Sequence, residues 1–107
     1  MRYFYHASCK ALLITACIFS APSYANKALA GKNGCLACHA TNEKLVGPAY
    51  KDVAQKYEGV VGAKETLIQH ILEGGVGRWG DMPMPPQKQL SSKQAAVLAE
   101  WILKGAN

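Results

Sequence analysis

The sequence predicts an all-α domain of about four short helices, and three observations lead to this prediction. Apolar side chains recur every three or four residues, most clearly over 64–73 and between Ser91 and Gly105. No segment alternates apolar and polar residues as a half-buried strand does. Glycine and proline separate the periodic segments, so the helices must be short.

Residues 1–25 have the pattern of a secretory signal peptide. A basic start that ends at Lys10 is followed by an apolar run from Ala11 to Phe19 and by small residues up to Ala25. The run is too short to span a bilayer as a helix, which takes about 20 apolar residues. We therefore expect a signal that is cleaved after Ala25, export to the periplasm and no membrane anchor, with residues 26–107 as a single mature domain.

The mature domain is small, mildly basic and poor in cysteine. Removing 25 of the 107 residues leaves 82, takes away Cys9 and Cys17 and lowers the formal charge from +5 to +3. An alternative, a lipoprotein signal with a lipidated Cys17, is disfavoured because few residues separate it from Lys10. The lysines are scattered, so we expect no nucleic-acid partner. A monomer is the default expectation. A chain of this size buries only about 60% of its unfolded surface, so a bound cofactor would supply much of its core.

A short helix over 26–33 leads into a Cys-x-x-Cys-His motif at residues 35–39. The thiols of Cys35 and Cys38 can each add across a vinyl group of one haem, while the imidazole of His39 reaches the iron. This is the attachment pattern of c-type haem. A redox dithiol would leave His39 unexplained, and a zinc site would need a fourth ligand such as His70. A plain disulfide is disfavoured by the short spacing.

Three further helices are predicted from side chains that share one face. The first covers 49–57, through Tyr50, Val53 and Tyr57. The second covers 64–73 and ends at Gly74-Gly75, with a stripe formed by Leu67, Ile68, Ile71 and Leu72. The third follows a capping box of Ser91 and Gln94, ends at Gly105, and buries Ala95, Leu98, Trp101 and Ile102.

The segment 74–90 is rich in glycine and proline, so no helix can run through it. Met82 and Met84 each precede a proline in this stiff loop, where methionine has few apolar partners to pack against. A thioether held in this way suits a weak sixth bond to iron, and the spacing alone does not choose between the two. His70 lies to the side of its helical stripe, so we expect a surface residue there and not a second axial ligand.

Together these segments resemble the small class I bacterial cytochromes c, particularly the short periplasmic ones that donate electrons to nitrite reductase and terminal oxidases. The resemblance covers almost all of the mature domain through four segments: 35–39, 46–54, 79–80 together with 83–86, and 98–103. It implies the class I cytochrome c fold, wrapped around one haem c bound through two thioethers. It also implies redox proteins that dock transiently at the haem edge, with a cytochrome bc1-type donor and nitrite reductase or a terminal oxidase as acceptor.

The resemblance also assigns roles to single residues near the iron. It makes Met84 the sixth ligand and Met82 only its neighbour. It makes the Pro48 carbonyl the acceptor for the second ring nitrogen of His39, where the residues alone allow Gly47-Pro48 to be a simple turn.

Further from the iron, the resemblance places the indole of Trp79 at a haem propionate. His70 stands where relatives carry Arg or His near a propionate, which implies a reduction potential that shifts between about pH 5 and 8. Gln87 stands where a polar amide near the Met84 sulfur is common, although the stretch from Gln87 to Ser91 is one residue longer here.

An iron held by both His39 and Met84 has six ligands, so a substrate cannot bind without expelling one. This favours electron transfer over catalysis, and a thioether favours ferrous iron. We therefore expect a one-electron shuttle and not an enzyme. The alternatives are a haem peroxidase or gas-binding sensor with a labile methionine, and a colourless zinc or dithiol module.

Overall fold

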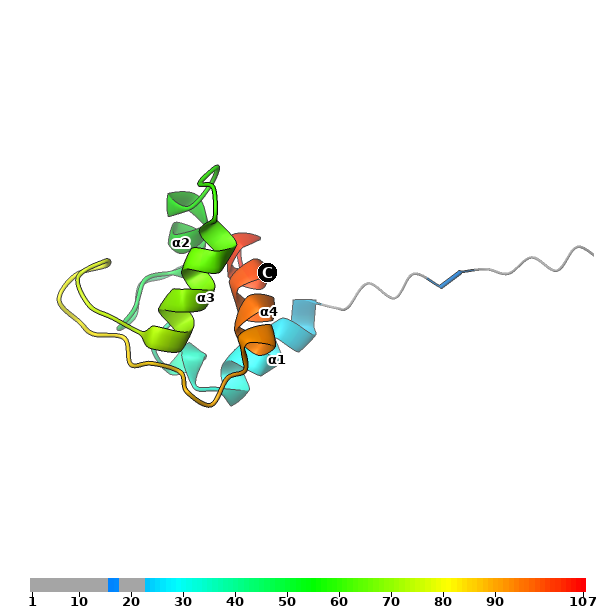
Figure 1. The fold of residues 1–107 in the computed structure, drawn as a ribbon, viewed down its shortest axis with the longest axis horizontal. Helices are drawn as coiled ribbons and strands as arrows, with labels where there is room; N and C mark the ends of the chain where they lie inside the picture. Colours follow the sequence, from blue (N-terminus) through cyan, green and yellow to red (C-terminus); the bar gives the residue numbers. More distant parts are fainter. Residues whose placement is uncertain (1–15, 18–22) are drawn as a thin grey trace, which may run out of the picture.

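The computed structural model describes residues 16–17 and 23–107, and the predicted signal peptide falls mostly outside these residues. The helices are α1 (Ser23–Lys32), the 3-10 turn η1 (Cys35–Ala37), α2 (Tyr50–Lys56), α3 (Ala63–Glu73) and α4 (Ser92–Leu103) (Figure 1). Over 23–107 the only β-type pairing is one isolated bridge between Gly75 and Met84. The all-α prediction is therefore confirmed for this part of the chain.

The last helix, α4, is the centre of the packing. It contacts α1, α2 and α3, which lie around it in Figure 1. Its buried side chains are Ala95, Leu98, Ala99, Trp101 and Ile102. They include the four core residues predicted from the periodicity, and burial of this face against three helices drives the association.

The first turn of α4 has the predicted capping box. The hydroxyl of Ser91 accepts from the backbone nitrogen of Gln94 at 3.1 Å, and the Gln94 side chain accepts from the backbone nitrogen of Ser91 at 2.9 Å. Two N–H groups that would otherwise lack a partner at the helix start are thereby satisfied. This local exchange sets the point at which the loop ends and α4 begins.

Helix α3 has the predicted stripe, with Leu67 and Ile71 buried and the neighbouring Ile68 and Leu72 packed against the core. It ends at Gly74, which has a φ of 65°. A side chain at this glycine would collide with the backbone carbonyl of Met84, so glycine is required both by the angle and by the space. The α3 terminus therefore lies directly against the segment that carries Met84.

Helix α1 begins at Ser23, three residues before the predicted start at Asn26, and α2 is slightly shorter than predicted. The turn η1 was not predicted. None of the helices among residues 16–17 and 23–107 combines the length and the apolar character needed to cross a membrane.

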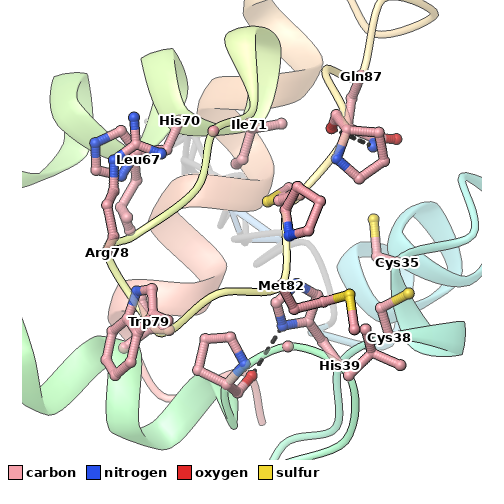
Figure 2. A pocket seen from close by; sticks show the side chains of 18 of the residues that line it. Cys35, Cys38, His39, Leu67, His70, Ile71, Arg78, Trp79, Met82 and Gln87 are labelled. Atoms are coloured by element: carbon pink, nitrogen blue, oxygen red, sulfur yellow. Dashed lines mark hydrogen bonds between the residues drawn. The ribbon is translucent and has the colours of Figure 1, made fainter.

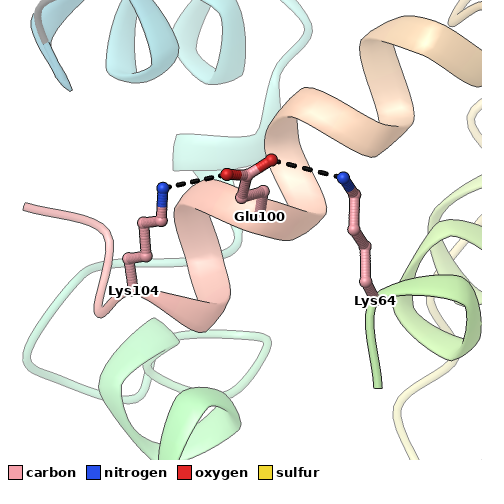
Figure 3. A network of polar contacts seen from close by, with 3 residues as sticks. All are labelled: Lys64, Glu100 and Lys104. Carbon is pink, nitrogen blue, oxygen red and sulfur yellow. Dashed lines mark hydrogen bonds and ion pairs between the residues drawn. The ribbon is translucent and has the colours of Figure 1, made fainter. Parts of the chain in front are cut away.

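Helices α3 and α4 are also linked by charges at the surface (Figure 3). The carboxylate of Glu100 contacts Lys64 of α3 at 3.2 Å and Lys104, one turn further along, at 2.9 Å. The side chains of Lys64, Glu100 and Lys104 are 44%, 50% and 72% exposed to water, where ion pairs contribute little to stability. The interface between α3 and α4 thus depends mainly on its apolar residues.

Candidate functional site

A pocket lies beside the buried faces of α3 and α4, and the loop 74–90 covers it. Its apolar walls come from Leu67 and Ile71 of α3 and from Leu98 and Ile102 of α4. Sulfur and nitrogen donors enter from other segments, as Figure 2 shows for Cys35, Cys38, His39 and Met82. The structure therefore brings all six sequence-predicted site residues to one pocket: Cys35, Cys38, His39, Pro48, Trp79 and Met84.

The two cysteines are placed by η1. The backbone nitrogens of Cys38 and His39 both donate to the carbonyl of Cys35, at 3.2 and 2.9 Å, which closes a tight turn. Both thiols are free and half-buried. Burial raises the pKa of the Cys35 thiol, which keeps it protonated at neutral pH, whereas a redox dithiol depends on a lowered thiol pKa. The environment of Cys35 thus disfavours the dithiol alternative.

The zinc alternative lacks a ligand set in the described part of the chain. Over residues 16–17 and 23–107, no three His, Cys, Asp or Glu side chains gather as a metal site would require. His70, the fourth ligand considered from the sequence, lies on α3 and lines the pocket on the side of Arg78 and Trp79 (Figure 2).

The imidazole of His39 is held in one orientation. Its Nδ1 lies 2.8 Å from the carbonyl oxygen of Pro48, as the resemblance implied. A carbonyl can only accept, so Nδ1 carries the proton and Nε2 keeps its lone pair. The ring also stacks on Tyr50, with 4.9 Å between centroids and 13° between planes. His39 is thus prepared to act as a nitrogen donor through Nε2.

Gly47 packs against the same ring. A β-carbon at this position would lie 2.8 Å from Nδ1 and 2.9 Å from Nε2 of His39, and closer still to Cε1. The backbone nitrogen of Gly47 also donates to the Cys38 carbonyl at 2.7 Å. Gly47 therefore lets the chain pass close beside His39, a role that the sequence interpretation missed.

The loop 74–90 is held across its base by a short antiparallel pairing. Gly75 donates to the Met84 carbonyl at 3.0 Å and accepts from the Met84 nitrogen at 2.8 Å. Met84 is half-buried, whereas Met82 is 64% exposed. Both line the pocket, but only Met84 belongs to the paired backbone, which favours it as the positioned thioether.

The pocket wall formed by Arg78, Trp79 and His70 carries positive charge. Lys56 contacts this wall, with its ammonium 4.4 Å from the centroid of the Trp79 ring. Burial lowers the pKa of His70, and the charges of Arg78 and Lys56 lower it further, while Glu73 opposes them. His70 was predicted to be a surface residue, but it is partly buried and lines the pocket.

The amide of Gln87 is engaged within its own loop. Its Nε2 donates to the Pro85 carbonyl at 2.9 Å, and its Oε1 accepts from Gln89 at 2.8 Å. The resemblance had placed this amide near the Met84 sulfur, but both of its polar atoms have other partners here. Gln89, two residues further along, is the partner of the Gln87 oxygen.

The donor set and the shape of the pocket fit a c-type haem. The thiols of Cys35 and Cys38 and the imidazole of His39 come from one short segment, residues 35–39. A thioether comes from the loop 74–90. Aliphatic side chains from α3 and α4 form walls suited to a flat apolar ring. In Figure 2 the two thiols and the residues Arg78 and Trp79 lie at opposite ends of the pocket. This arrangement matches haem, whose vinyl and carboxylate groups lie on opposite edges.

Three comparisons with known proteins agree with this fit. The cytochrome c family model matches residues 25–106. Cytochrome c-551 of Allochromatium vinosum is 41% identical over 92 residues, which covers 86% of this chain and 98% of the relative. Cytochrome c-552 of Hydrogenobacter thermophilus is 46% identical over 94 residues, covering 88% and 95%. The crystal structure of wild-type Nitrosomonas europaea cytochrome c552 superimposes with a TM-score of 0.72 at 46% identity, covering 74% of this chain and 98% of that one.

Proposed function

The chain belongs to the cytochrome c family, and from this premise we propose that it is a periplasmic one-electron shuttle whose haem iron is held by His39 and Met84. The family membership means that it is a small electron carrier with one covalently bound haem c. When bound, the haem supplies an iron that alternates between the ferric and ferrous states. The residues of the chain determine how that iron is held.

In this proposal Cys35 and Cys38 form the two thioether bonds, and His39 donates through Nε2. The observation that carries it is the hydrogen bond from His39 Nδ1 to Pro48, because it fixes both the tautomer and the direction of the ring. The Trp79 indole lies at the pocket end where the haem carboxylates belong and provides an N–H donor for one of them.

Ligation by Met84 fills the sixth position, so the protein transfers electrons and does not bind a substrate at iron. The soft sulfur favours the ferrous state and raises the reduction potential relative to a second histidine. The half-buried position of Met84 and its backbone pairing with Gly75 support this assignment over Met82.

We further propose that residues 1–25 are a signal peptide cleaved after Ala25 and that the mature domain is a monomer in the periplasm. Its redox partners would be a cytochrome bc1-type donor and nitrite reductase or a terminal oxidase. Exposed apolar side chains at the pocket rim, Val46, Val76 and Met82, give these partners a small surface for transient contact.

The ligand assignment is tested by replacing Met84 with Ala in the haem-loaded protein, with Met82→Ala as the matched control. Met84→Ala should abolish the visible band of a sulfur–iron bond and lower the reduction potential, whereas Met82→Ala should keep both. Retention of the band in Met84→Ala would refute the assignment. Rapid binding of carbon monoxide to the reduced parent protein would instead support the gas-binding or peroxidase alternative.

A further inference from the structure

Two cations, Lys56 at the end of α2 and Arg78 in the loop, hold the first half of the loop 74–90. The ammonium of Lys56 donates to the carbonyl of Arg78 at 3.2 Å. The same ammonium lies over the ring of Trp79, 4.4 Å from its centroid, within the range of a cation–π interaction. One side chain of α2 thus holds two consecutive residues of the loop.

Arg78 continues this connection across the base of the loop. Its Nη1 donates to the carbonyl of Gly74 at 3.2 Å. Its guanidinium also fills the space beside Gly75, where an added β-carbon would lie 2.6 Å from Nη1. Gly75 is the residue whose backbone pairs with Met84 in both directions. An unbroken series of contacts therefore runs from Lys56 through Arg78 to the backbone of Met84.

The part of the loop before Met82 needs such contacts because its own sequence gives it little rigidity. Gly74, Gly75, Gly77 and Gly80 all have positive φ angles, and glycine has the largest conformational freedom to lose. The prolines that stiffen the loop all follow Met82. The half of the loop before Met82 thus depends on the side-chain contacts of Lys56 and Arg78.

From these contacts we infer that Lys56 and Arg78 are positioning residues for Met84, which keep its thioether at the sixth position of the haem iron. The inference rests on the proposed function, because it takes Met84 as the ligand. A thioether binds iron weakly, so its occupancy depends on how little freedom the loop has to lose. Both cations act through the backbone of Gly74 and Gly75, which pairs with Met84.

The test uses the haem-loaded protein with Lys56→Met and Arg78→Met, which remove the charges but keep long side chains. Lys51→Met, on the exposed side of the same helix, is the matched control for lost charge. Imidazole added to the ferric protein must displace the thioether, so its affinity reports how firmly Met84 is held. We expect a roughly tenfold gain in imidazole affinity for each of the two variants. The control and Lys56→Arg should match the parent protein.

A second measurement follows the loop itself. Amide hydrogen exchange at Gly75 and Met84 should accelerate by a similar factor in both variants and remain unchanged in Lys51→Met. Unchanged imidazole affinity and exchange in both variants would overturn the inference. The inference would also be overturned if the reduction potential shifted while imidazole affinity and amide exchange stayed unchanged. The two cations would then act only through their charge on the haem. Absence of a thioether band in the parent protein would instead contradict the proposed function.

Discussion

Replacing Gly47 with Ala tests whether the chain must pass close to the His39 ring. The added methyl group would lie 2.8 Å from Nδ1 and 2.9 Å from Nε2, well inside ordinary van der Waals contact. Gly47 is not among the residues with positive φ, so the substitution tests the available space and not the backbone angle.

The cost follows from how firmly the ring is held. To restore ordinary contact the imidazole must move by roughly an ångström, away from Pro48 and against Tyr50, on which it stacks. Overfilling a packed site costs about 1–3 kcal/mol, and loss of the bond to Pro48 adds about 1 kcal/mol. We therefore expect the free energy of unfolding to fall by about 2–4 kcal/mol, which lowers the melting temperature by roughly 10–25 °C.

Guanidinium unfolding of the haem-loaded protein measures this loss, and the visible spectrum reports whether the histidine–iron bond persists. Gly31→Ala in α1 is the matched control, because a β-carbon there would lie 3.6 Å from Cδ1 of Leu36, an ordinary contact. Gly31→Ala should keep or raise the stability, since alanine is favoured over glycine in a helix by about 1 kcal/mol. A Gly47→Ala protein as stable as the parent, with an unchanged spectrum, would refute the reasoning.

Three further predictions concern other parts of the structure. Ser91→Ala should lower the free energy of unfolding by about 1 kcal/mol, because Gln94 loses its capping acceptor, whereas Ser92→Ala should have little effect in the same denaturant titration. Leu98→Ala should cost about 2–5 kcal/mol, since this side chain is 2% exposed, and an unchanged unfolding midpoint would contradict its place in the core. The pKa of His70 is lowered because the folded protein disfavours the charged imidazole. The contribution of His70 to the free energy of unfolding should therefore decline as the pH falls below 6.5. Arg78→Gln should raise the pKa of His70 in an NMR titration, and an unshifted midpoint would show that Arg78 does not act on it.

The helices could be predicted from the sequence because local rules determine them. Leu67 and Ile71 repeat at helical spacing, and both are buried. Ser91 and Gln94 are three residues apart, and both bonds of the capping box are present. The predicted start of α1 was wrong by three residues, because helix ends are the least sharply defined part of a helix.

The site could be predicted only in part. The Cys-x-x-Cys-His motif is contiguous, so its residues were certain to lie together, and the contact between His39 and Pro48 spans only nine positions. The bond from Lys56 to Arg78 joins residues 22 positions apart, and it depends on the path of a glycine-rich loop that no local pattern determines. Gly47 was missed as a contact of His39 because the residues alone allow Gly47-Pro48 to be a simple turn.

The extent of α1 bears on the proposed cleavage after Ala25. The helix begins at Ser23, so the bond after Ala25 lies within its first turn. Under the proposed cleavage after Ala25, this turn would have to be unwound, or not yet formed, when a peptidase acts on it. Cleavage there would also leave a cationic α-amino group at the start of the shortened helix, which opposes the helix dipole. The contact of α1 with α4 would then hold the shortened helix in place, so the amino-terminal helix depends on the carboxyl-terminal one.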